Sequence, residues 1–226
     1  FETAGGAIIK VDWSDLDGGD FVTCTDVIPT GKVADAIFKN IPSNWYSVPI
    51  HLIGHSRGAS VNTELAVDIG RYGIWVDHFT SLDPQPITHC GDVPIQIYDN
   101  ILFADNNYRD DGVPPRGEPV VGTYERVLNG IVTGDGEYCN KTAAPELPNG
   151  SAHSQVHTYY HGTISHKNDD GTIWYDDCVE HIQVQPKWYA PYSNMRGTGY
   201  YFSRIEMGDR YFYNGQFGPP NHWLTL

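Results

Sequence analysis

Ser56 has the clearest chemical signature in the sequence. It is the serine of Gly54-His55-Ser56-Arg57-Gly58, a G-x-S-x-G pattern that follows a short apolar run and precedes a stretch with helical periodicity. A strand, a tight turn and a helix in this order hold a serine hydroxyl clear of the backbone, beside the N–H groups of the first helical turn. Such a serine becomes a nucleophile when a neighbouring base takes its proton. We therefore predict that Ser56 is a nucleophile, and that Gly54 and Gly58 leave room for the turn and for packing of the helix on the strand.

Three regularly spaced histidines in the last third of the sequence are candidates for the base. His153, His157 and His161 are spaced i, i+4, i+8. Because His153 precedes the expected helix 156–164, a loop can bring it over the serine, whereas the other two lie within the helix. The same spacing suits a metal site, but Ser154 stands where H-E-x-x-H metalloenzymes have their glutamate. His153 is the predicted base, and a metal site formed by the three histidines is the alternative.

The base needs an acid that orients it. Asp83 closes the expected strand 76–82, which follows the helix after the serine. The carboxyl ends of parallel strands meet at one edge of a sheet, so this position suits a partner of the base. Asp105, one strand later, after the expected strand 97–104, is the alternative acid. The order serine, aspartate, histidine along the chain favours Asp83.

Strands and helices are expected to alternate around these residues. Four apolar runs predict buried strands: 7–13, 48–53, 76–82 and 97–104. Two stretches with an apolar stripe predict helices over 30–41 and 57–72, and a third helix is expected over 156–164. This alternation predicts an α/β fold, a mostly parallel sheet flanked by helices, in a single domain of residues 1–226. Residues 107–150 are expected to be irregular, and the aromatic-rich residues 165–226 are expected to form an extension that packs on the core.

Charge and cysteine content narrow the class of protein. The net charge of −14 argues against nucleic acid and anionic membrane surfaces as partners. No apolar run approaches the roughly 18 residues of a transmembrane helix. The four cysteines are scattered, which predicts two disulfides of unspecified pairing and a secreted or otherwise extracytoplasmic protein: Cys24, Cys90, Cys139 and Cys178. The start at Phe1 predicts a mature chain that has lost a leader or a longer N-terminal segment.

Four groups of residues occur in order along residues 6–164: Val11-Asp12-Trp13, Gly54-His55-Ser56-Arg57-Gly58, Leu82-Asp83-Pro84 with Pro86, and Ala152-His153 with Tyr159-Tyr160 and Thr163-Ile164. They resemble the V-D-W, G-H-S-L-G, G-L-D-P-A-x-P and N-H, Y-Y and S-I motifs of the pancreatic-type lipase family of α/β-hydrolases. The resemblance implies a lipase-like core over residues 1–164. It also implies Ser56 as nucleophile, Asp83 as acid and His153 as base of a serine esterase or lipase.

Two departures from the family concern the oxyanion hole. Arg57 replaces a leucine of the family motif, and its backbone N–H is still expected to serve as an oxyanion donor. The family's second donor follows an H-G segment on a strand before V-D-W. This sequence begins after that point, so a cleaved segment or another group is expected to supply the donor. That family can hold a calcium near the loop after Asp83, but the ligand pattern does not match clearly, and we predict no required cofactor.

The substrate is expected to be a carboxylic ester, with lipids and polymers both open. A catalytically inactive subunit of the same fold is the alternative. Its exposed tryptophan and tyrosine side chains would then bind a polymer or a neighbouring subunit, including a second copy of the chain.

Overall fold

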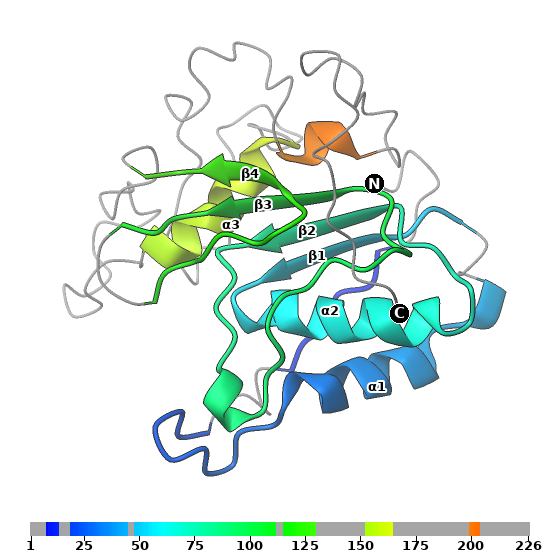
Figure 1. The fold of residues 1–226 in the computed structure, drawn as a ribbon, viewed down its shortest axis with the longest axis horizontal. Coiled ribbons are helices and arrows are strands. Elements are labelled where there is room, and N and C mark those ends of the chain that lie inside the picture. Colours follow the sequence, from blue (N-terminus) through cyan, green and yellow to red (C-terminus); the bar gives the residue numbers. More distant parts are fainter. Residues whose placement is uncertain are drawn as a thin grey trace, which may run out of the picture.

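The structure is a computed structural model that describes residues 8–13, 19–44, 48–111, 115–129, 152–164 and 199–203. Four strands in these residues form one sheet: β1 (His51–His55), β2 (His78–Leu82), β3 (Ala104–Tyr108) and β4 (Tyr124–Val127). Three α-helices flank it: α1 (Thr30–Asn40), α2 (Arg57–Gly70) and α3 (Ala152–Gly162) (Figure 1). Two short 3₁₀ turns are η4 (Thr88–Cys90) and η6 (Gly199–Phe202).

All four strands are parallel and lie in the order β1-β2-β3-β4. β1 and β2 pair in register from His51 with His78 to His55 with Leu82. Parallel neighbours need a crossover between them, and α2 forms the crossover from β1 to β2. The predicted α/β class, a parallel sheet with helices on it, is confirmed. No helix in the described ranges has the length and apolar character to cross a membrane.

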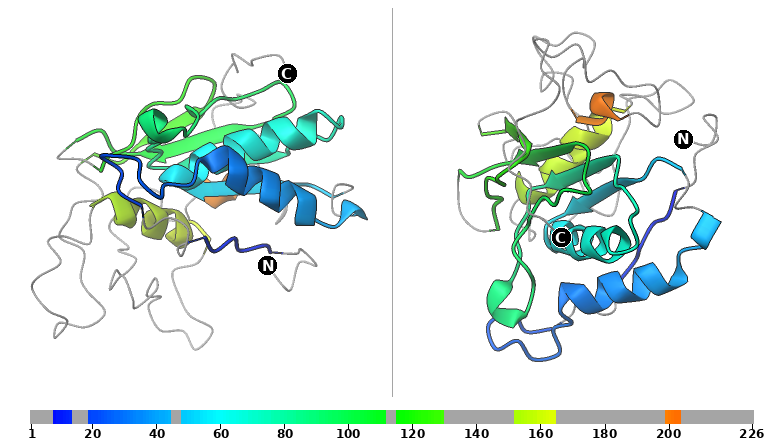
Figure 2. Two further views of the ribbon diagram at one scale, coloured as in Figure 1. Left: turned by 90° about the horizontal axis from the view of Figure 1, so that it is seen from below. Right: turned by 45° about the vertical axis from the view of Figure 1, so that its right-hand side comes forward.

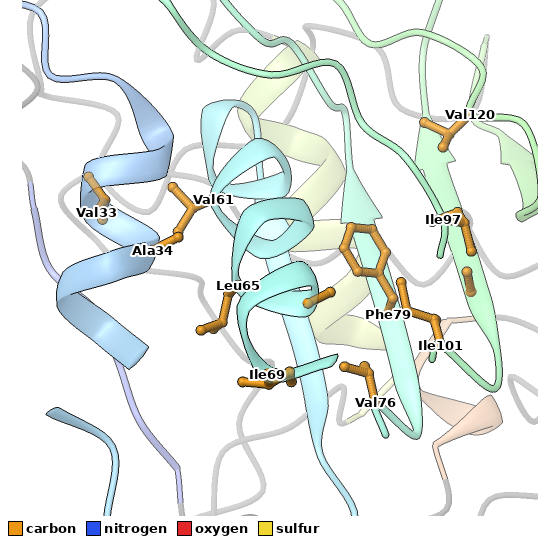
Figure 3. Close-up of a cluster of buried hydrophobic side chains, with 12 residues drawn as sticks. Val33, Ala34, Val61, Leu65, Ile69, Val76, Phe79, Ile97, Ile101 and Val120 are labelled. Atoms are coloured by element: carbon orange, nitrogen blue, oxygen red, sulfur yellow. The ribbon is translucent and has the colours of Figure 1, made fainter. Parts of the chain in front are cut away.

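α2 covers one face of the sheet through apolar contacts. Figure 3 shows Phe79 and Ile101 gathered on the strand side of α2, whereas Val61 points toward Val33 and Ala34 of α1. All five side chains are buried and belong to one hydrophobic cluster. α1 therefore forms an outer layer that packs on α2. The apolar stripes that predicted these two helices are the surfaces by which they are buried.

α3 lies on the other face of the sheet (Figures 1 and 2). Polar side chains are buried on this face. Thr80 Oγ1 donates to Asp105 Oδ1 over 2.5 Å, and His78 Nε2 lies 2.8 Å from the same oxygen. Nε2 of His51 lies 2.8 Å from Thr80 Oγ1. Because Thr80 gives its single hydroxyl proton to Asp105, His51 must be the donor and Thr80 the acceptor in this hydrogen bond. The hydroxyl of Tyr160, from α3, lies 3.4 Å from Thr80 Oγ1. Directional hydrogen bonds therefore join α3 to this face.

The strand expected at 7–13 is not present over residues 8–13, and residue 7 lies outside the described ranges. Ile8, Ile9 and Val11 are exposed. A strand needs a neighbour for its backbone, and β1 pairs only with β2 in the described part of the chain. Residues 9–13 instead run beside α1, and together they line a groove of about 620 Å³.

Two further expectations about strands are wrong. The apolar run 97–104 contains buried residues, but β3 begins only at Ala104 and continues through Asp105-Asn106-Asn107. These polar side chains are buried because neighbouring side chains bond to them, so hydrophobicity does not mark the strand. β4 lies within 107–150, a range expected to be irregular, and its side chains alternate between half-buried and exposed. Residues 130–151 lie outside the described ranges.

Candidate active site

Ser56 occupies a strained turn between β1 and α2. Its backbone angles are φ 55° and ψ −124°, values that a residue with a Cβ adopts at a cost of about 1–3 kcal/mol. The turn is held by the Ser56 N–H, which donates to the carbonyl of Leu82 over 2.9 Å. A Cβ at Gly54 would lie 2.4 Å from the Gly58 carbonyl oxygen, so glycine at 54 lets the helix pack on the strand, as predicted. The corresponding prediction for Gly58 is wrong, because a Cβ at this position would meet nothing within 4 Å.

Asp83 and His153 are joined by a direct hydrogen bond. Nδ1 of His153 lies 2.6 Å from Oδ2 of Asp83, and the aspartate is buried. The other carboxylate oxygen accepts the backbone N–H of Arg109 over 2.7 Å. Because a carboxylate accepts, His153 carries a proton on Nδ1, which leaves the lone pair of a neutral ring on Nε2. This is the tautomer that a general base needs.

His153 lies in a different local structure from the one expected. α3 begins at Ala152, so His153 belongs to the first turn of the helix and not to a loop before it. His55, the residue before Ser56, reaches this turn, because its Nε2 lies 3.0 Å from the carbonyl oxygen of His153. Ser56 Oγ makes no hydrogen bond within the described residues, so proton transfer from Ser56 to His153 stays a prediction.

Asp105, the alternative acid, bonds to a different histidine. Its Oδ1 lies 2.8 Å from Nε2 of His78, in a second buried His–Asp pair at the centre of the polar face. Asp83 is therefore the aspartate that the structure brings to His153. His157 lies further along α3, and its ring and that of His55 make an edge contact at a centroid distance of 5.0 Å.

Tyr160 gives the polar face a testable pH dependence. Burial raises the pKa of its hydroxyl well above the usual value, and the charge of Asp105 raises it further. In the unfolded chain a tyrosine loses its proton near pH 10, whereas the buried hydroxyl keeps it, so the unfolded state binds fewer protons. The free energy of unfolding is therefore expected to fall as pH rises above 10, with a contribution of up to about 1.4 kcal/mol per pH unit from this group.

Urea unfolding between pH 9 and 11 measures the effect. Tyr160→Phe is expected to have a shallower decline than the wild type, because the variant has no proton to lose at this position. Tyr72→Phe, which removes an exposed tyrosine, is the matched control. Parallel declines in wild type and Tyr160→Phe would contradict the prediction.

The side chain of Arg57 forms a buried ion pair with Asp92. Its Nε and Nη2 donate to the two carboxylate oxygens over 2.7 and 2.8 Å, and Nη2 also donates to the carbonyl of Ile28. Asp92 further accepts the backbone N–H groups of Thr30 and Ile87. The guanidinium of Arg57 is therefore held in place by an ion pair and hydrogen bonds. The backbone N–H of Arg57 belongs to the first turn of α2, where N–H groups point out of the helix end.

Sequence reasoning missed the residues that fix Asp83. Besides the N–H of Arg109, Gly117 matters, because a Cβ at this position would lie 2.5 Å from Oδ1 of Asp83. It missed Asp92 as well. The sequence holds no signal for any of them, since each is defined by a contact between distant segments.

Cys24 and Cys90 form a disulfide, which confirms one of the two expected bridges. Cys139 and Cys178, left for the other, lie outside the described ranges. Among the described residues, Cys24, His89 and Cys90 are the one group of ligand atoms close enough together to hold a metal ion. Both sulfurs are consumed by the disulfide, so this group offers no thiolate. The alternative site of His153, His157 and His161 is not among such groups.

Comparison with known proteins identifies no relative of the chain. No protein-family model, no curated protein and no solved structure matches the chain.

Proposed function

We propose that the chain is a serine hydrolase that cleaves carboxylic esters through an acyl-enzyme. The observation that carries this proposal is the bonded pair of His153 and Asp83 beside a strained serine turn. Ser56 follows β1, and Asp83 follows β2, its parallel neighbour in register. Both residues therefore lie at the carboxyl edge of the sheet, where parallel α/β proteins bind ligands.

The proposed reaction has two halves. Ser56 Oγ attacks the acyl carbon of the ester while Nε2 of His153 takes the hydroxyl proton, and the backbone N–H of Arg57 donates to the oxyanion. The intermediate collapses, and His153 gives the proton to the departing alcohol oxygen. Water then attacks the acyl-enzyme with the same base, which releases the carboxylic acid and restores Ser56. Asp83 keeps His153 in the productive tautomer throughout.

The lipase-like α/β-hydrolase fold and a location outside the cytoplasm belong to the same proposal. The order of serine turn, Asp83 after the next strand and His153 on a late helix supports the fold. The disulfide between Cys24 and Cys90 supports an oxidising compartment. The V-D-W segment lends less support than expected, because residues 11–13 form no strand. The aromatic extension of residues 165–226 stays a prediction, since only 199–203 of it are described.

A fluorophosphonate probe tests the proposal directly, because it phosphonylates an activated serine and leaves ordinary serines unmodified. We expect the folded full-length protein to gain one probe adduct, which peptide mass spectrometry locates on Ser56. Ser56→Ala and urea-unfolded wild type should gain none. Ser60, a buried serine on α2, provides a second control, since Ser60→Ala should still be labelled.

The opposite outcome has a specific meaning. A folded wild type that takes no adduct and leaves a short nitrophenyl ester intact would contradict the hydrolase. The same holds if Ser56→Ala hydrolyses the ester at the wild-type rate. Inertness combined with tight self-association would instead support the non-catalytic subunit.

A further inference from the structure

His55 contacts both halves of the proposed site. It is the last residue of β1 and immediately precedes Ser56. Its Nε2 lies 3.0 Å from the backbone carbonyl oxygen of His153. Its ring also packs against the ring of His153 at a centroid distance of 4.4 Å and presents an edge contact to His157 at 5.0 Å. One side chain thus connects the strand that carries the nucleophile to the helix that carries the base.

Hydrogen-bond chemistry defines this contact. A carbonyl oxygen can only accept, so Nε2 of His55 must carry a proton. The carbonyl of His153 lies in the first turn of α3, where it faces the N–H of residue 157 along the helix. A carbonyl oxygen has two lone pairs, so it can accept from His55 as well. The contact therefore anchors the start of α3 without disrupting the helix.

The anchor matters because α3 is not held in the main hydrophobic core. Among the described residues, that core takes its buried members from α1, α2, the strands and the segments beside them, and none from α3. Val156 and Tyr159 of α3 are fully buried outside that cluster. Near its other end, the hydroxyl of Tyr160 lies 3.4 Å from Thr80 Oγ1 and 3.5 Å from His51 Nε2. Directional contacts at the two ends therefore act together with these buried side chains to fix the position of α3 on the sheet. A displacement of about 1 Å in a catalytic group can cost about 10²-fold in rate.

We infer that His55 is a positioning residue for the proposed reaction. It holds the first turn of α3, which carries His153, so that Nε2 of His153 can take the proton of Ser56 in the proposed reaction, while Asp83 holds the other ring nitrogen. The expected effect of His55 on kcat rests on the proposed function. Its expected effect on the position of α3 rests only on the contacts of His55.

Two amide substitutions at His55 distinguish loss of the hydrogen bond to His153 from loss of the imidazole ring. The amide nitrogen of glutamine reaches about as far as Nε2 of histidine, whereas the shorter asparagine reaches only as far as Nδ1. His55→Gln should therefore keep the bond to the carbonyl of His153, and His55→Asn should lose it. On a short nitrophenyl ester we expect His55→Asn to lower kcat by about 10- to 100-fold with KM little changed. His55→Gln should recover most of that loss.

A spectroscopic readout makes the inference independent of turnover. The Nδ1 proton of His153, held by Asp83, should give a downfield proton NMR signal in the wild type and in His55→Gln. In His55→Asn this signal should broaden or exchange faster, because the start of α3 is no longer anchored. An unchanged signal and unchanged kcat in a folded His55→Asn would overturn the inference, as would equal losses in both variants. If the wild type hydrolyses no ester but the His153 signal is altered only in His55→Asn, the proposed hydrolase activity is contradicted. The role of His55 in positioning α3 is then still supported.

Discussion

Asp83→Asn is expected to lower kcat for ester hydrolysis about 10⁴-fold while the protein stays folded. Asparagine has the shape of aspartate but offers one carbonyl oxygen and one NH₂ group. The backbone N–H of Arg109 can only donate, so it keeps the amide oxygen. The NH₂ group then faces Nδ1 of His153, which must accept, and the ring proton moves to Nε2. In the proposed reaction Nε2 has to accept the proton of Ser56, so the variant would hold the proposed base in the wrong tautomer.

The loss of kcat is measured as the steady-state rate of nitrophenyl ester hydrolysis after any initial burst. Each rate is divided by the fraction of the protein that is folded. Asp105→Asn is the matched control, because it makes the same change in the other buried His–Asp pair, with His78. We expect the control to destabilise the fold but to keep kcat per folded molecule close to that of the wild type. Comparable losses of kcat in the two variants would show that Asp83 has no special role.

Asp92→Ala is expected to lower the free energy of unfolding by about 3–5 kcal/mol. The guanidinium of Arg57 is 5% exposed and its partner carboxylate is 0% exposed. Removal of the carboxylate takes away the anionic partner of a buried positive charge, and it also removes the acceptor of two backbone N–H groups. Because Arg57 follows Ser56, activity should fall together with stability. Urea unfolding followed by tryptophan fluorescence measures the change.

The double variant Arg57→Met, Asp92→Leu tests the cause. It removes both charges, so it should recover much of the stability that Asp92→Ala loses, although the N–H groups of Thr30 and Ile87 stay without their acceptor. A double variant as unstable as Asp92→Ala would mean that these backbone contacts, and not the buried charge, dominate. A loss below about 1 kcal/mol in Asp92→Ala would contradict the assignment of a buried ion pair.

The parts of the fold that follow from local pattern were predictable from the sequence. α1 and α2 have an apolar stripe that becomes their buried surface, and glycine at 54 with serine at 56 marks the turn between strand and helix. Asp83 was predictable because it closes a strand of five buried residues. For His153 the residue was predicted, and the structure joins it to Asp83, but the boundary of α3 was placed too late.

The rest depends on contacts between distant segments. β3 contains Asp105 and two asparagines, and their burial makes sense only once β2 lies beside them. Residues 8–13 have the composition of a strand but pair with no strand within the described residues. The ion pair of Arg57 and Asp92 joins residues 35 positions apart, and no periodicity connects them. The anchor from His55 to His153 spans 98 positions. Sequence pattern reports which surface of an element is buried, but not which polar partners meet there.

The disulfide between Cys24 and Cys90 has a consequence for how the site comes apart. The bond closes a covalent ring with a sequence separation of 66, and Ser56 and Asp83 both lie inside it. A ring of this size removes about 4 kcal/mol of chain entropy from the unfolded state. His153 lies outside the ring. The proposed nucleophile and acid are therefore tethered to each other even in a partly opened protein, whereas the proposed base meets them again only when α3 docks on the sheet.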